Sequence, residues 1–220
     1  MTAPVVQAGW KGTTGALAAV MLSFNAHVAV ALAASAGIAL GVPLLLGLVA
    51  WRAFRAPAAG WLIGAGTFFV SQVVLRLPWQ IALGVWLQKT HASSTVMWSW
   101  LAVSAFTAGL FEETGRFVAY RTLFKDRTAR GGVMLGLGHG GLESMLLVGL
   151  PLAVNVLLYL ALANGLSFGL PEAQRPLVVQ QFNALTPALA LAGGVERLSS
   201  MAVHVGLSVL VLQVFRRDSK

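Results

Sequence analysis

The chain has 220 residues, of which 57% are hydrophobic and only 10% are charged, whereas soluble domains are about 25% charged; an ordinary soluble fold is therefore excluded. The net charge is +8, but no DNA- or RNA-binding motif accompanies it, so a nucleic-acid partner is not expected. Cysteine is absent, which excludes disulfides, thiol nucleophiles and thiolate metal sites.

Five apolar stretches are each long enough for a membrane-spanning helix, which needs about 20 residues. They predict an all-α, polytopic transmembrane helix bundle with about five spans, and up to seven as the alternative. The whole chain, residues 1–220, is expected to form a single integral membrane domain. Residues 11–25 either extend the first helix or lie at the interface. The predicted spans lie near residues 26–51, 60–85, 96–124, 133–162 and 189–215.

The fourth predicted span and the segment after it contain prolines that shape them. The span is long and holds Pro151, so we expect one tilted or kinked helix there. Residues 164–187 are interrupted by prolines and charged residues, among them Pro171, Glu172 and Arg175. This segment is expected to be an outer loop, with a short amphipathic helix as an option.

The distribution of lysine and arginine predicts the orientation, because these residues concentrate in cytoplasmic loops. Nine lie on the side that carries the C-terminus and three on the other, which predicts an N-terminus outside and a C-terminus inside. The expected location is a prokaryotic plasma membrane, with the lipid bilayer as partner. The nine are Arg52, Arg55, Arg121, Lys125, Arg127, Arg130, Arg216, Arg217 and Lys220, and the three are Lys11, Lys89 and Arg175.

Ionisable residues inside the predicted spans give the main functional signal. Four of the seven acidic residues lie there, together with three arginines and two histidines. A charged group in hydrocarbon costs about 2.5 kcal/mol or more, so these side chains must pair with one another or line a wet cavity. In chain order they are Arg76, Glu112, Glu113, Arg116, His139, Glu143, Glu196, Arg197 and His204.

Helical spacing places several of these residues on common faces. Arg116 follows Glu112 by four residues and Glu113 by three, so it can pair with either. His139 and Glu143 are one turn apart on the fourth span. The last span has a polar stripe at four-residue steps, formed by Glu196, Ser200, His204 and Ser208.

Three of these residues share a depth in the membrane. Counted from the cytoplasmic basic residues at 1.5 Å per residue, Glu112, His139 and His204 all lie roughly 13–18 Å deep. A carboxylate that faces imidazoles can bind or deprotonate a water molecule, and a second histidine can stabilise an oxyanion. This combination indicates a hydrolase.

Binding of a divalent metal such as zinc is the alternative role for these residue types. Imidazole and carboxylate are zinc ligands, and Glu113, His139 and His204 form the candidate set. The HExxH motif is absent, since the predicted helix with His139 and Glu143 has no second histidine. The spacing therefore leaves the metal open, and no cofactor is certain.

Three motifs resemble those of the YhfC family of intramembrane metalloproteases, and the resemblance covers about residues 26–215. That family is similar to the CAAX prenyl proteases and bacteriocin-processing enzymes, which are glutamic-type intramembrane endopeptidases. The Val-Leu-Arg76-Leu-Pro segment fits the same pattern. The three motifs are Glu112-Glu113-x-x-Arg116, Gly-Leu-Gly-His139-Gly-Gly-x-Glu143, and Glu196-Arg197 followed by His204-x-x-x-Ser208.

The resemblance implies an intramembrane endopeptidase that hydrolyses a peptide bond of a membrane-associated peptide or protein. Glu112 and His139 would activate water, while His204 and Ser208 would form the oxyanion site. Glu113 stays an alternative base, because the sequence does not separate two adjacent glutamates. The supporting residues would be Arg76, Arg116, Glu143 and Glu196.

Two other function classes use the same kinds of residue. A non-catalytic membrane scaffold or immunity protein would keep the fold without the water-activating geometry, and the Glu112–Glu113–Arg116 group would then be a structural ion pair. A proton-coupled transporter also uses intramembrane Glu, His and Arg. The sequence shows no internal repeat, and five spans are few for such a carrier. The distances among the carboxylates and imidazoles discriminate between these classes.

Overall fold

The computed structural model describes residues 23–166 and 169–217, and within these ranges the regular structure is entirely helical. Five helical runs are long and apolar enough to cross a membrane, which confirms the predicted number. The chain is therefore an all-α, polytopic integral membrane protein. The five runs are Ala26–Arg52, Ala58–Lys89, Ser94–Leu123, Ala129–Ala163 and Pro187–Arg216.

Both termini lie outside the described residues. The predicted extension over residues 11–25 falls mostly there, as do Lys11 and Lys220 of the charge count. The orientation with the N-terminus outside and the C-terminus inside therefore stays a prediction.

The middle three spans are each built from α-helical pieces joined or ended by a π-helical segment. The second comprises α2 (Ala58–Phe68), η1 (Phe69–Arg76) and α3 (Leu77–Lys89). The third comprises α4 (Ser94–Val118) and η2 (Ala119–Leu123), and the fourth α5 (Ala129–Glu143), η3 (Ser144–Gly149) and α6 (Leu150–Ala163).

Two of these π-helical segments directly precede a helix with proline in its first turn. Pro78 is the second residue of α3, and Pro151 is the second residue of α6. Proline has no backbone N–H and its ring clashes with the carbonyl four residues earlier, so a widened turn before it relieves both problems. The irregularity expected at Pro151 thus takes the form of η3.

Side-chain caps begin two of the helices that carry intramembrane ionisable residues. Ser93 Oγ accepts a hydrogen bond from the backbone N–H of Val96 at the start of α4. Thr128 Oγ accepts one from Gly131 N at 3.1 Å at the start of α5. Each cap satisfies a backbone donor that the first helical turn leaves unpaired.

Internal contacts divide the chain into two compact units, and each is described by itself. The first holds residues up to Leu40 and Leu147–Glu196, and the second holds Gly41–Leu146 and residues from Arg197 onward. The division falls within α1 (Ala26–Arg52), η3 and α8 (Pro187–Arg217). The single-domain interpretation stays a prediction.

The first unit packs around Tyr159 of α6. Its ring lies 5.1 Å from that of Phe182, nearly perpendicular to it, and both belong to a cluster with Val28 and Leu32 of α1. Phe182 lies on α7 (Arg175–Asn183), which follows the short 3-10 turn η4 (Glu172–Gln174). The optional short helix of the 164–187 segment is therefore present.

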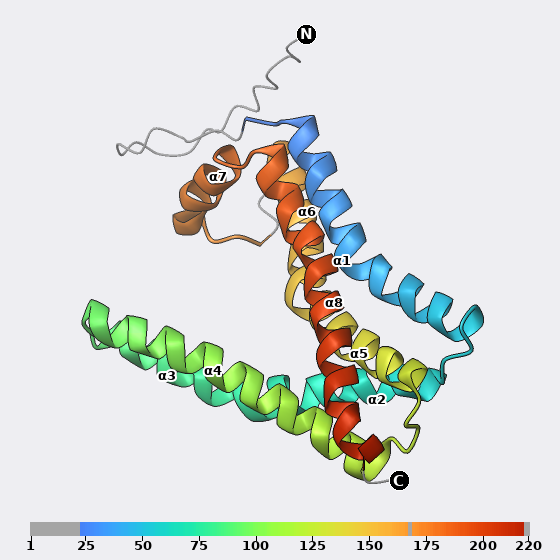
Figure 1. Cartoon of the computed structure of the whole chain (residues 1–220). Coiled ribbons are helices and arrows are strands. Elements are labelled where there is room, and N and C mark those ends of the chain that lie inside the picture. The colour runs from blue at the N-terminus through green and yellow to red at the C-terminus, as the bar shows by residue number, and fades with distance from the viewer. Residues whose placement is uncertain (1–22, 167–168, 218–220) are drawn as a thin grey trace, which may run out of the picture. The chain divides into compact units, whose positions relative to one another are not determined.

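The second unit contains the packing that positions the polar residues. In Figure 1, α3 and α4 run side by side as a long hairpin, and α2 crosses α5. The α2–α5 crossing is close because glycines face backbone on both sides. A Cβ at Gly138 would meet the carbonyl of Trp61, and one at Gly64 would meet the carbonyl of Leu135. Only residues without a side chain allow helices to approach this closely.

Gly64→Ala is expected to lower the free energy of unfolding by about 1–3 kcal/mol, because overpacking a tight contact has that cost. The new Cβ would also lie 2.9 Å from the backbone nitrogen of His139. Gly66→Ala is the matched control on the same helix, since a Cβ there meets nothing within 4 Å. Thermal unfolding in detergent should show a lower Tm for Gly64→Ala alone. Equal Tm values for the two variants would contradict the close-packing argument.

Candidate functional site

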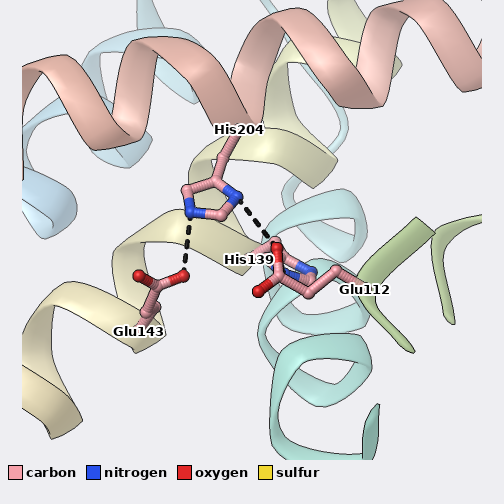
Figure 2. Close-up of side chains that lie close together, drawn as sticks. All are labelled: Glu112, His139, Glu143 and His204. Carbon is pink, nitrogen blue, oxygen red and sulfur yellow. Dashed lines mark ion pairs between the residues drawn. The ribbon is translucent and has the colours of Figure 1, made fainter. Parts of the chain in front are cut away.

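Four ionisable side chains from three helices converge in the second unit, as Figure 2 shows. Glu112 comes from α4, His139 and Glu143 from α5, and His204 from α8. One ligand atom from each lies within 4.8 Å of those of the others. The predicted convergence of a carboxylate and two imidazoles from three spans is therefore present, with a second carboxylate added.

His204 bridges the two carboxylates, and His139 faces Glu112. Glu112 Oε2 lies 3.6 Å from His139 Nε2 and 3.7 Å from His204 Nδ1. On its other side, His204 Nε2 lies 2.8 Å from Glu143 Oε2. The imidazole rings are 5.1 Å apart between centroids. We refer to Glu112, His139, Glu143 and His204 as the four-residue cluster.

Arg116 determines which nitrogen of His204 carries the proton. This guanidinium is fully buried and its Nη2 lies 2.6 Å from His204 Nδ1 and 3.4 Å from Glu112 Oε2. A guanidinium can only donate, so Nδ1 of His204 accepts, and the proton of the neutral ring lies on Nε2, which faces Glu143. Arg116 also pairs with Glu113 through Nη1.

Arg197 completes the cluster at the Glu143 end. Its Nη1 donates to Glu143 Oε1 at 3.1 Å. On a helix turning about 100° per residue, Arg197 is only about 20° from His204, whereas Glu196 is about 80° away. Glu196 is exposed and belongs to the first unit. The helical repeat therefore places Arg197, rather than Glu196, on the face of His204.

His139 is held by close packing, and its polar contact is the 3.6 Å approach of Nε2 to Glu112 Oε2. It is fully buried, and the ring of Phe68 meets it edge-on at 5.5 Å between centroids. Neither of its ring nitrogens has a hydrogen-bond partner among the described residues. On the same helix, a Cβ at Gly140 would come within 2.7 Å of the His204 ring, so this glycine makes room for the second imidazole.

The donor set fits a divalent metal ion. Two imidazoles and two carboxylates are ligands that zinc accepts, and the buried His139 Nε2, which has no hydrogen bond and lies 3.6 Å from Glu112 Oε2, is available to bind an ion. The residues that could hold the ion are Glu112, His139, Glu143 and His204. Since the proton of His204 lies on Nε2 here, coordination through that nitrogen would have to release it.

The remaining candidate residues lie around this cluster. Glu113 pairs with Arg116, its side chain is 36% exposed, and its carboxylate is not among the four clustered ligand atoms. Ser208, one turn after His204, is fully buried, and its Oγ has no hydrogen-bond partner within the part of the chain that the structure describes. Arg76 is buried and reaches the cluster only through a second side chain, Gln72.

Gln72 is the residue that charge-based reasoning missed. Its Nε2 donates to Glu112 Oε1 at 3.0 Å. The available signal was a polar amide inside an apolar span, four residues before Arg76 and hence on the same face.

One protein family matches most of the chain. A family model described as the YhfC intramembrane metalloprotease matches residues 38–219. A Bacillus subtilis (strain 168) protein named "Uncharacterized membrane protein YhfC" is 34% identical over 195 residues, which cover 82% of this chain and 72% of that protein. No solved structure matches the chain. The chain thus belongs to the YhfC intramembrane metalloprotease family.

Proposed function

We propose that this protein is an intramembrane endopeptidase that hydrolyses a peptide bond of a membrane-associated polypeptide at the four-residue cluster. The observation that carries the proposal is the meeting of two carboxylates and two imidazoles within 4.8 Å, inside helices that can span a membrane. A purely structural ion pair would need only Arg116 and its glutamates. It would leave no reason to bury His139 with both ring nitrogens unpaired.

Glu112 is placed to act as the general base. Its Oε2 faces both imidazoles and Arg116, so a water molecule near this oxygen could give up its proton to the carboxylate. His139 would orient the same water through Nε2. Arg116 also contacts this carboxylate oxygen, which fixes the position of the atom that receives the proton.

His204 and Ser208 would serve the developing oxyanion. The Nε2 proton of His204 faces Glu143 in this structure, so His204 would have to redirect it to the oxyanion, whereas the buried Ser208 Oγ has no hydrogen-bond partner among the described residues and its hydroxyl is free to donate. Glu143 and Arg197 orient the imidazole through the 2.8 Å contact at Nε2. The position of the His204 ring is therefore fixed before substrate binds.

In a metal-dependent form of the reaction, Glu112 and His204 would be ligands of a divalent ion held by the four-residue cluster instead of general base and oxyanion donor, and the ion would polarise the scissile carbonyl and activate the attacking water as a Lewis acid. The chain's own residues provide the ligands and their orientation. Arg116 and Arg197 each contact a carboxylate of this set, and such outer contacts set the geometry of metal ligands.

The test uses the full chain in proteoliposomes with synthetic peptides that each contain an apolar segment. New peptide termini, read by mass spectrometry, are expected with Zn²⁺ present, lost after chelation and regained when Zn²⁺ is restored. Cleavage that persists after chelation would contradict the metal requirement and leave a metal-free glutamate mechanism. An absence of cleavage across the peptide set, with Zn²⁺ bound, would contradict the peptidase assignment.

A further inference from the structure

A series of hydrogen-bonded polar side chains, separate from the contacts within the four-residue cluster, runs through the membrane-spanning part of the second unit and ends on Glu112. It begins at Arg76, which is only 7% exposed although it lies inside a span. The Arg76 Nη2 atom donates to the backbone carbonyl of Ser104 at 2.6 Å and to Ser104 Oγ at 3.2 Å. Its Nη1 donates to Gln72 Oε1 at 2.9 Å. The guanidinium of Arg76 is thus held by hydrogen bonds to Gln72 and to α4.

The orientation of the Gln72 amide follows from this contact. Gln72 is 3% exposed, and its two amide ends have different partners. Arg76 can only donate, so the amide oxygen must face it, and the NH₂ group must face the other way. There Nε2 donates to the carbonyl of Ala108 at 2.9 Å and to Glu112 Oε1 at 3.0 Å. Arg76 therefore fixes Gln72 as a donor toward Glu112.

Because of this donor, the two oxygens of Glu112 have different partners. Oε1 accepts from Gln72, while Oε2 faces His139, His204 and Arg116 at 3.4–3.7 Å. A carboxylate held at one oxygen cannot rotate freely about its last bond. The contact therefore keeps Oε2 directed at the centre of the cluster.

Arg76 does not do this by pairing with the carboxylate itself. Among the described residues, no ion pair joins Arg76 to Glu112, and the guanidinium reaches the cluster only through the amide. Both Gln72 and Arg76 lie on η1, and π-helical turns of this kind are frequent at functional sites.

We propose that Gln72 is a positioning residue that orients the Glu112 carboxylate, and that Arg76 and Ser104 lock the Gln72 amide in its donating orientation. The role as positioning residue rests on the proposed function of Glu112. The effect of these hydrogen bonds on the Glu112 carboxylate can be tested without a metal or a substrate.

The test is infrared spectroscopy of the metal-free full chain in lipid nanodiscs, labelled with ¹³C-glutamate. The carboxyl bands of Glu112 are assigned by difference against Glu112→Gln. Gln72→Met, which keeps the length of the side chain and removes the amide, is expected to shift these bands because Oε1 loses its donor. Arg76→Met is expected to shift them less, because the amide remains but can flip.

Gln80→Met is the matched control. Gln80 lies on the same span, and its Nε2 donates to Ser104 Oγ rather than to Glu112; the same substitution should leave the bands of Glu112 in place, because Arg76 keeps its bonds to Gln72 and to the Ser104 carbonyl. If Gln72→Met does not fold, Gln72→Asn shortens the side chain by one methylene and should give the same shift. Unshifted Glu112 bands in a folded Gln72 variant would overturn the proposal. A failure to bind Zn²⁺ or cleave peptides would instead count against the proposed function.

Discussion

Glu112→Gln is expected to lower the rate of peptide cleavage by about 10²- to 10⁴-fold, which is the usual contribution of a positioned general base. Glutamine has nearly the same shape, and its side-chain oxygen can still accept a hydrogen bond from Gln72. What it lacks is the ability to take a proton from water. The loss should therefore appear in kcat, and Tm is measured alongside because Arg116 keeps Glu113 but loses the charge of Glu112.

Glu113→Gln is the matched comparison, because it makes the same change at the adjacent residue. The Glu113 side chain is 36% exposed, pairs with Arg116 and lies outside the four-residue cluster, so a much smaller loss of kcat is expected. Both variants are measured in the proteoliposome assay with Zn²⁺ present. If Glu113→Gln proves the inactive variant and Glu112→Gln retains its rate, then Glu113 is the base.

The five spans could be predicted within a few residues because apolar runs of membrane-spanning length are a strong signal. Counting residues from the cytoplasmic basic side chains also places Glu112, His139 and His204 at one level, and the structure brings these three residues together. Both predictions depend only on helix rise and on the cost of placing charge in lipid.

The choice between the two glutamates could not be made in the same way. Adjacent residues on a helix differ by about 100° in direction, and the rotation of α4 about its axis is set by packing against neighbouring helices such as η1. The structure turns Glu112 toward the histidines, and this placement is why Glu112 is the base in the proposed mechanism. The contact of Gln72 with Glu112 could not be predicted, because a neutral amide lacks the large desolvation cost that singled out the charged residues.

The glycines of α5 could be assigned to close helix packing but not to individual partners. The sequence shows four glycines within six residues, from Gly136 to Gly141. Only the structure shows that Gly138 faces the backbone of Trp61, whereas Gly140 faces the ring of His204. The first glycine supports the fold and the second makes room in the site, although they are two residues apart.

Arg116→Met is expected to destabilise the protein by about 3–5 kcal/mol, the usual cost of removing one partner from a buried ion pair. Arg116 is fully buried and contacts Glu112, Glu113 and His204. Methionine would fill part of the space but would leave two neighbouring carboxylates without their common cation. Arg130→Met is the control, since Arg130 is exposed near the start of α5. Thermal unfolding in detergent should show a large drop in Tm for Arg116→Met only.

A double variant separates the loss of charge pairing from the loss of packing. If unpaired carboxylates cause the instability, adding Glu113→Gln to Arg116→Met should recover part of the lost Tm, because one of the two charges is then removed. If lost packing causes it, the double variant should be no more stable than Arg116→Met alone. Recovery would show that Arg116 stabilises the protein by neutralising the two glutamates that it contacts within a span.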